Sequence, residues 1–233
     1  MITSHKIKQL LWFLVFSLIG FQVNQAWATV VFIVGPSGVG KSTVVQNLVK
    51  TSAGEFQKIV SHTTRAPRKH EEDGKDYYFI SQADFAKKDQ NSEFIVTSNE
   101  YGQCYGLAYQ EIKKASDASK IFIKEIGVDI IKPLKEKLGK QGIFIFLAPP
   151  SYEILQSRLR QRSLASGESD KELEKRLQNA IDILPYEVQC DYVIVANNIN
   201  ETTHHIRTIL AERQGQIGKM DDVQLYLNRL AVS

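Results

Sequence analysis

The feature that most constrains this chain is a buried-strand pattern that runs directly into a glycine-rich loop. Val30–Val34 is a run of apolar, mostly β-branched residues, which is typical of a strand covered on both faces in a parallel sheet. GPSGVGKS, residues 35–42, follows at once and fits G-x-x-x-x-G-K-[ST] at every specified position. A helical pattern comes next, with Val44, Val45 and Leu48 on one side. This order predicts an α/β fold whose first loop binds a polyphosphate.

The residue types of this loop suit phosphate chemistry. Its glycines let successive backbone N–H groups converge on a polyphosphate, and the helix N-terminus adds the positive end of a dipole. Lys41 is expected to reach the β- and γ-phosphates of ATP, and the Ser42 hydroxyl is expected to bind Mg²⁺. The alternative is a glycine turn with a purely structural role. The predicted ATP-binding residues are Gly35, Pro36, Ser37, Gly38, Val39, Gly40, Lys41, Ser42 and Thr43.

Apolar runs alternate with helical patterns along the rest of the chain. The strand-like runs are Ile121–Ile123, Ile143–Leu147 and Tyr192–Val195, and the helical patterns lie at Asp129–Leu138, Tyr152–Arg162, Lys171–Leu184 and Glu201–Arg213. Strands that alternate with helices predict βαβ units and a parallel sheet. Between Ile59 and Gly106 the pattern changes to short strands with turn residues, such as DYYFIS and EFIVTS. We expect a small, mainly β insert on the α/β body.

A second candidate phosphate site lies in SHTTRAPRKHEEDGKDYYF, residues 61–79. Arg65 and Arg68 stand among hydroxyl residues and precede a pair of tyrosines. Forked guanidinium donors and O–H groups suit a phosphate monoester. The same stretch also fits a solvated basic turn that pairs with the acidic residues 71–73. The residues alone leave both interpretations open.

Several motifs together resemble the guanylate kinase family. They are the phosphate loop, SHTTRAPR followed by DY, YG at residues 105–106, APPS at residues 148–151 and DYVIV at residues 191–195. The resemblance runs from about Val30 to about Ile209 and implies transfer of the γ-phosphoryl group of MgATP to a small-molecule acceptor, GMP. It also implies a P-loop NTPase three-layer core over residues 29–58 and 107–213, an acceptor-binding insert at about 59–106 and a helical lid at about 158–176.

The resemblance further implies roles for individual residues. Ser61, Arg65, Arg68, Tyr77 and Tyr105 would hold the acceptor phosphate, with Glu125 also binding the acceptor. The catalytic residues would be Lys41, Arg158, Arg162 and Arg176, where the three arginines belong to the lid and close over the transferring group. Arginines suit this role because the transition state spreads negative charge over the equatorial oxygens of the phosphoryl group. The alternative for the lid arginines is a solvated helix surface.

Three positions that would recognise the guanine base depart from the family pattern. Val96 stands in place of a glutamate, Leu107 in place of a serine or threonine, and Gly127 in place of a second acidic residue. A pocket without these polar groups does not select guanine by hydrogen bonding. A kinase for another phosphomonoester, such as a ribose phosphate, and an inactive module that binds phosphorylated peptides therefore remain alternatives. Candidates for compensation are Glu93, Glu100 and Asp129.

The two ends of the chain carry further patterns. Lys6 and Lys8 precede an apolar run, residues 10–21, and then Ala26-Trp27-Ala28. This order is typical of a secretory signal peptide, so residues 1–28 predict export, or membrane tethering if they are not cleaved. The alternative is that the start of the sequence is misassigned and that the protein is cytoplasmic. Residues 214–233 predict an amphipathic helix.

Composition narrows the classes of partner. Hydrophobic residues make up 43% of the chain and charged residues 24%, as in a globular unit with its own core. The net charge is only +3, and Lys6 and Lys8 lie in the signal-like segment, so we expect no nucleic-acid partner. Cys104 and Cys190 form no CxxC pair, which argues against a metal or redox site.

Overall fold

The computed structural model describes residues 30–68, 71–100, 102–115, 120–166 and 169–213. Its central sheet has five parallel strands in the order β2-β7-β1-β8-β9. These strands are β1 (Val30–Val34), β2 (Phe56–Lys58), β7 (Ile121–Glu125), β8 (Gly142–Ala148) and β9 (Tyr192–Val195). The signal-like segment and the expected C-terminal helix lie outside the described residues.

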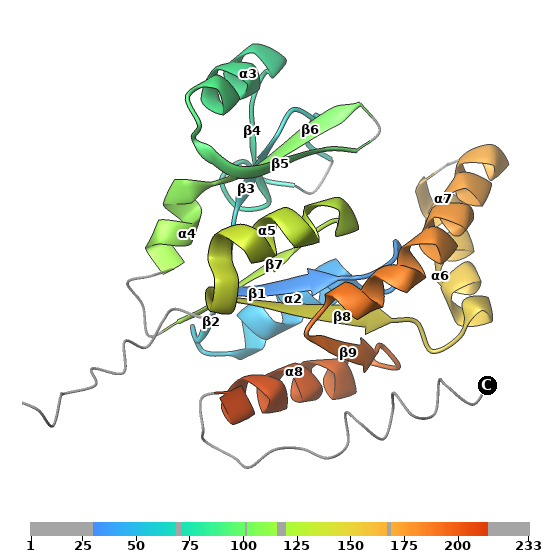
Figure 1. Cartoon of the computed structure of the whole chain (residues 1–233). Coiled ribbons are helices and arrows are strands. Elements are labelled where there is room, and N and C mark those ends of the chain that lie inside the picture. Colours follow the sequence, from blue (N-terminus) through green and yellow to red (C-terminus); the bar gives the residue numbers. More distant parts are fainter. Residues whose placement is uncertain (1–29, 69–70, 101, 116–119, 167–168, 214–233) are drawn as a thin grey trace, which may run out of the picture.

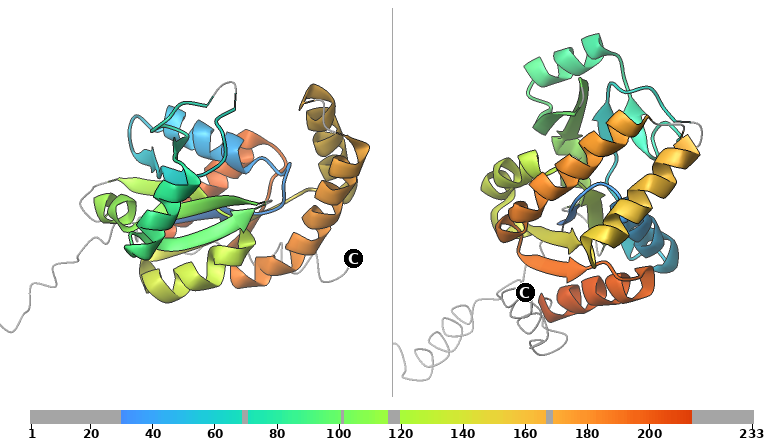
Figure 2. Two further views of the ribbon diagram at one scale, coloured as in Figure 1. Left: turned by 90° about the horizontal axis from the view of Figure 1, so that it is seen from above. Right: turned by 90° about the vertical axis from the view of Figure 1, so that its right-hand side faces the viewer.

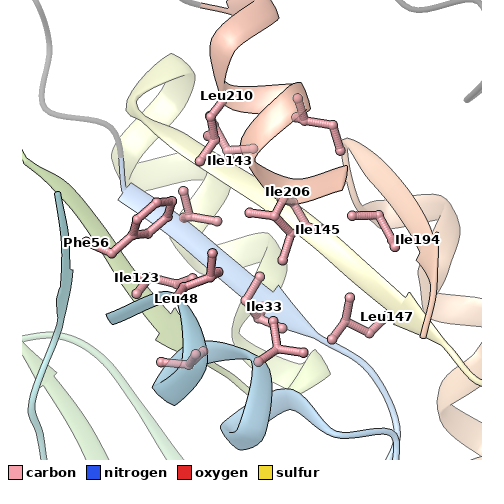
Figure 3. Packing of buried hydrophobic residues seen from close by; sticks show 14 of the residues in the cluster. Ile33, Leu48, Phe56, Ile123, Ile143, Ile145, Leu147, Ile194, Ile206 and Leu210 are labelled. Atoms are coloured by element: carbon pink, nitrogen blue, oxygen red, sulfur yellow. The ribbon is translucent and has the colours of Figure 1, made fainter. Parts of the chain in front are cut away.

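Helices cover both faces of this sheet, which makes three layers (Figure 1). Side chains of successive strand residues alternate between the faces. On one face Ile33 and Ile145 pack against α2 (Lys41–Thr51) and α8 (Ile199–Arg213), as Figure 3 shows. On the other face Phe32 and Phe144 pack against α5 (Ile131–Leu138). The predicted α/β class with a parallel sheet core is confirmed.

A second sheet forms beside the core, with strand order β4-β3-β6-β5. Its strands are β3 (Ser61–Thr63), β4 (Tyr77–Phe79), β5 (Phe94–Glu100) and β6 (Gln103–Ala108), and α3 (Gln82–Gln90) and α4 (Tyr109–Ala115) accompany them. Helix α3 was not predicted from the sequence. The Ser81 hydroxyl begins this helix by accepting a hydrogen bond from the Asp84 backbone at 3.0 Å.

Two helices, α6 (Tyr152–Ser166) and α7 (Asp170–Ile183), stand together at the side of the sheet (Figure 2). They are held by their own apolar cluster, which contains Leu155, Leu159 and Ala180. Ser169 and Glu172 form a capping box that fixes the start of α7. Short 3-10 turns at Val128–Ile130, Gly139–Gln141 and Leu184–Gln189 connect neighbouring elements. In the part of the chain that the structure describes, no helix is long and apolar enough to cross a membrane.

Candidate active site

The glycine loop connects the end of β1 with the start of α2. Gly35 has a φ of +141°, and a Cβ atom there would lie 2.5 Å from the backbone oxygen of Leu147. Gly40 caps α2 with a φ of +108°. Only glycine adopts this backbone without strain at Gly35, because the neighbouring strand β8 leaves no room for a side chain. The loop therefore owes its shape to its own glycines and to β8.

Lys41 folds back over this loop. Its Nζ atom donates hydrogen bonds to the backbone oxygens of Gly35 at 2.6 Å and Pro36 at 3.0 Å. Ser42 and Thr43 follow on the first turn of α2 and are exposed. The ammonium group thus lies at the mouth of the loop, and the two hydroxyls are open to a ligand.

A cavity of about 710 Å³ brings most of the predicted site residues together. It is bounded by the glycine loop, the second sheet, the end of β7 and the helices α6 and α7. The predicted residues that line it are Gly35, Ser37, Lys41, Ser61, Arg65, Arg68, Tyr77, Tyr105, Glu125, Arg162 and Arg176. The two anion sites that the sequence predicted, far apart along the chain, therefore face one shared space.

Arg65 is fixed in this cavity by a carboxylate. Its Nη1 and Nη2 atoms donate to the two oxygens of Glu71 at 2.9 and 2.8 Å, and both side chains are largely buried. The backbone N–H of Arg68 also donates to Glu71, at 2.8 Å. Burial opposes the charge on Glu71, but the bonds from Arg65 and Arg68 outweigh it and lower the pKa of that carboxyl. Arg65 therefore pairs with an acid, as the basic-turn interpretation expects, and also lines the cavity.

Two tyrosine rings frame the same guanidinium group. The ring centroids of Tyr77 and Tyr105 are 5.9 Å apart, and the guanidinium carbon of Arg65 lies 5.5 Å from the Tyr77 ring. Hydrogen bonds from Arg65, first to Glu71 and then to Tyr105, raise the pKa of the guanidinium. Arg68 is more open, with 61% of its side chain exposed. One arginine is thus preorganised and the other is available to a ligand.

Arg158 occupies a different place from the other predicted catalytic residues. It donates to the backbone oxygens of Val39 at 3.3 Å, Ala196 at 3.2 Å and Asn197 at 3.3 Å. These groups line a second cavity of about 490 Å³ on the other side of the glycine loop, which also contains Thr43. Arg162 lines both cavities. The structure therefore puts Arg162 and Arg176 at the larger cavity and Arg158 at the smaller one.

The positions expected to recognise a base are apolar in the folded structure as well. Val96 is 8% exposed and Leu107 is 4% exposed, and both line the larger cavity with Gly127. Of the candidates for compensation, Asp129 lines this cavity. Glu93 instead forms an ion pair with Lys88 at 2.8 Å. The structure does not describe the side chain of Glu100. Ser98, Asn99 and Gln103, which the sequence reasoning did not consider, add polar groups to the cavity wall.

Lys124 on β7 is a further cavity residue that was not predicted from the sequence. This lysine is only 4% exposed and lines the larger cavity. Burial lowers the pKa of its ammonium group to about 8, although Glu125 beside it acts in the opposite direction. A lysine within the apolar run IFIKEI was the signal that could have found it, since a charged group inside a strand that belongs to a buried sheet is uncommon.

Comparison with known proteins agrees with this geometry. A family model described as guanylate kinase matches residues 28–213. The guanylate kinase of Clostridium tetani is 33% identical over 192 residues, which cover 82% of this chain and 89% of that protein. The guanylate kinase of Lactobacillus johnsonii is 35% identical over 176 residues, which cover 76% and 84%. The crystal structure of guanylate kinase from Anaplasma phagocytophilum matches with a TM-score of 0.66 and 29% identity, over 81% of this chain and 87% of that one.

The match to the family model includes the glycine loop, the second sheet and the α6–α7 pair that surround the larger cavity. Because the family model spans well over half of the sequence and the curated relatives are covered over most of their length, the chain belongs to the guanylate kinase family.

Proposed function

We propose that this chain transfers the γ-phosphoryl group of MgATP to GMP, giving ADP and GDP. The observation that carries the proposal is the single cavity lined by both the glycine loop and the Arg65, Arg68, Tyr77 and Tyr105 cluster. In-line transfer needs a donor phosphate and an acceptor phosphate held in one space with water kept out. Family membership makes the chain a phosphotransferase and ATP its donor.

Three cationic side chains are suited to the transition state. Lys41 leaves the loop oxygens of Gly35 and Pro36 to bind the β- and γ-phosphates, whose charge is stronger than that of two carbonyls. Arg162 and Arg176 approach the transferring group from the helices α6 and α7. The transition state spreads negative charge over three equatorial oxygens, and these cations stabilise that charge.

The Ser42 hydroxyl, exposed at the first turn of α2, fits a Mg²⁺ site. Mg²⁺ in such sites keeps several waters and takes most other ligands from the phosphates, so one protein hydroxyl is a sufficient anchor. Ser42 would hold the ion, which would supply positive charge against the negative charge that develops on the transferring group.

The acceptor phosphate is held by Ser61, the Arg65 and Arg68 pair and the two tyrosine hydroxyls. Arg65 is preorganised for this role by Glu71, and Arg68, which is more exposed, closes over the bound phosphate. Polar groups for the base come from Ser98 and Asp129 in the same wall.

An acceptor panel tests this function. The purified chain is incubated with MgATP and GMP, dGMP, AMP, UMP or ribose 5-phosphate, and ADP release is measured by a coupled assay. We expect GMP to give the highest kcat/KM. A better turnover of ribose 5-phosphate would favour the non-guanine kinase, and no turnover above ATP hydrolysis with any acceptor would favour the binding module.

We further propose that residues 1–28 direct export or membrane attachment. Support comes from the basic, apolar and small-residue order of this segment. N-terminal sequencing of the protein recovered from its native cells tests the proposal. A mature chain that starts at Thr29 supports cleavage, and a chain that starts near Val30 without any longer product contradicts it.

A further inference from the structure

Lys124 is a buried charged group in the wall of the acceptor side of the cavity. It lies on β7, one residue before Glu125, and its side chain faces the second sheet. Among the residues that the structure describes, none forms a hydrogen bond with its Nζ atom. Burying an ammonium group without hydrogen-bond partners costs free energy, so this lysine lowers the stability of the folded protein.

The surroundings of the ammonium group point to the phosphate of the acceptor and not to its base. The Nζ atom of Lys124 lies 4.7 Å from the centre of the Tyr77 ring, and the guanidinium carbon of Arg65 lies 5.5 Å from the same centre. Ser61, also buried, lines the cavity with both. Lys124 and Arg65 thus present positive charge around one tyrosine whose hydroxyl belongs to the expected phosphate cradle.

The base side of the cavity shows the opposite trend. Val96 and Leu107 are apolar where the family resemblance implies hydrogen-bonding groups, and both are buried. The positive charge that an acceptor meets on this side of the cavity, from Arg65, Arg68 and Lys124, therefore lies at the phosphate end. An acceptor gains most of its binding free energy there, because charge-assisted hydrogen bonds in a low-dielectric wall are stronger than apolar contacts with a base.

We propose that Lys124 is an acceptor-binding residue which donates hydrogen bonds to the phosphate of the phosphomonoester, so that this chain recognises its acceptor more by phosphate than by base. The proposal deepens the proposed function and rests on it for the identity of the site. Binding of the phosphate dianion supplies the partner that Lys124 lacks, and the lysine in turn replaces part of the recognition lost at Val96 and Leu107.

The main test is the substitution Lys124→Met, which keeps the length of the side chain and removes its charge. Calorimetric titration measures the binding of three probes, GMP, guanosine and inorganic phosphate, to the full chain. We expect the Kd of GMP and of phosphate to rise at least about tenfold, as for loss of a hydrogen bond to a charged group, while the Kd of guanosine stays constant. In the coupled assay the KM for GMP rises by the same factor and kcat changes little.

Lys58→Met is the matched control. Lys58 lies 6.0 Å from the same tyrosine ring, but it pairs with Asp76 at 3.4 Å and does not line the cavity. Its removal is expected to leave all three Kd values unchanged. An equal loss of GMP affinity in both variants would overturn the proposal, since general charge near Tyr77 would then explain it. An equal loss for guanosine and GMP in Lys124→Met would do the same, because the lysine would act on the shape of the pocket.

The pH dependence of GMP binding gives a second readout. The groups that face Lys124 are Glu125, Lys58, Asp76 and the Tyr77 ring. We expect the Kd of GMP to rise above about pH 8 in the wild type, where Lys124 loses its proton, and to stay level there in Lys124→Met. The same rise in both proteins would contradict the assignment.

The outcomes for Lys124 and for the enzyme are separable. If GMP and phosphate bind and Lys124→Met weakens both, but no acceptor is phosphorylated, the proposed function fails and the role of Lys124 stands. If GMP is phosphorylated and Lys124→Met changes neither its KM nor the Kd of phosphate, the role of Lys124 fails and the function stands.

Discussion

At the scale of single residues, two lysines of the same cavity have opposite environments. Lys41 is bound to two loop oxygens that a ligand can replace. Lys124 is enclosed by strands and has no hydrogen-bond partner among the described residues. Lys41 is suited to bind the phosphoryl group that is transferred, and Lys124 is suited to bind the phosphate of the acceptor, which stays in place. Their substitutions therefore affect different quantities.

Lys41→Ala is expected to lower kcat about 100-fold or more, because it removes a cation that stabilises the charge of the transition state. The free energy of unfolding should change little, since the hydrogen bonds from Lys41 to the Gly35 and Pro36 oxygens stay within one loop and join no separate elements. Steady-state kinetics and urea unfolding measure the two effects. Lys50→Ala, an exposed lysine in the last turn of the same helix, is the control and should retain full activity.

The ammonium group of Lys124 also predicts a pH dependence of stability. Its pKa is 10.5 in the unfolded chain and about 8 in the folded one. Between these values the unfolded chain binds more protons, so the stability of the wild type relative to Lys124→Met rises with pH, by about 3 kcal/mol in total. Below about pH 8 the methionine variant is the more stable protein. Urea unfolding of both proteins at pH 7 and pH 10 measures the difference, and an equal gap at both pH values would contradict the burial of a charged Lys124.

At the scale of elements, the segments that connect strands and helices position the groups of both anion sites. The segment between β3 and β4 places Glu71 within hydrogen-bonding distance of Arg65. The loop between β1 and α2 packs against β8 at Gly35. A single substitution tests each segment, by weakening the Glu71–Arg65 pair or by adding a side chain at Gly35.

Glu71→Gln is expected to lower the free energy of unfolding at pH 7 by about 1.5 to 3 kcal/mol, because glutamine offers Arg65 one neutral acceptor oxygen in place of two charged ones. The pKa of Glu71 is lowered in the folded state, so its contribution is present above the unfolded pKa of 4.5 and is lost as the pH falls below it. The stabilities of the two proteins should therefore converge in acid. Glu72→Gln, at the exposed neighbouring carboxylate, serves as the control.

Gly35→Ala is expected to destabilise the fold by about 2 to 3 kcal/mol, since it adds a clash with the Leu147 oxygen to an unfavourable φ. Gly54→Ala separates the two causes. Gly54 has a φ of +92° and no atom within 4 Å of an added Cβ, so only the backbone term of about 1 kcal/mol remains. Thermal and urea unfolding of the two variants test the difference, and equal losses would show that β8 does not constrain the loop.

At the scale of the whole molecule, the second sheet and the α6–α7 pair are separate parts of the fold (Figures 1 and 2), and residues of both line the larger cavity. Donor and acceptor groups therefore come from separate parts of the fold. A compound that occupies both sites at once links these parts.

A bisubstrate compound that joins adenosine to guanosine through a polyphosphate is expected to stabilise the chain more than ATP or GMP alone. At 100 times its Kd, a ligand that binds only the folded state adds about 2.7 kcal/mol. For a chain of this size the gain corresponds to a rise in Tm of roughly 5 to 10 °C. Differential scanning fluorimetry measures it, and the rise should disappear in Lys41→Ala combined with Arg65→Ala. A rise that persists in this double variant would place the compound elsewhere.

The amino-acid sequence by itself determined the parts of this protein that depend on local order. The apolar run, the glycines and the helical pattern after them specify a strand, a phosphate loop and a helix, and alternating runs specify the parallel sheet. The spacing of Arg65 and Arg68 left an anion site and a basic turn both open, and the resemblance to the family favoured the anion site. Each of these signals comes from residues that are close together in the sequence.

Only the tertiary structure decided how distant groups meet. It joined the loop of Lys41 and the cradle of Arg65 in one cavity, put Arg158 at a second cavity and enclosed Lys124 behind Tyr77. These arrangements depend on the packing of two sheets and a helix pair, which periodicity along the chain does not encode. A lysine in a strand pattern has the same local sequence whether water or a phosphate faces it, so its role is fixed by what the fold places opposite.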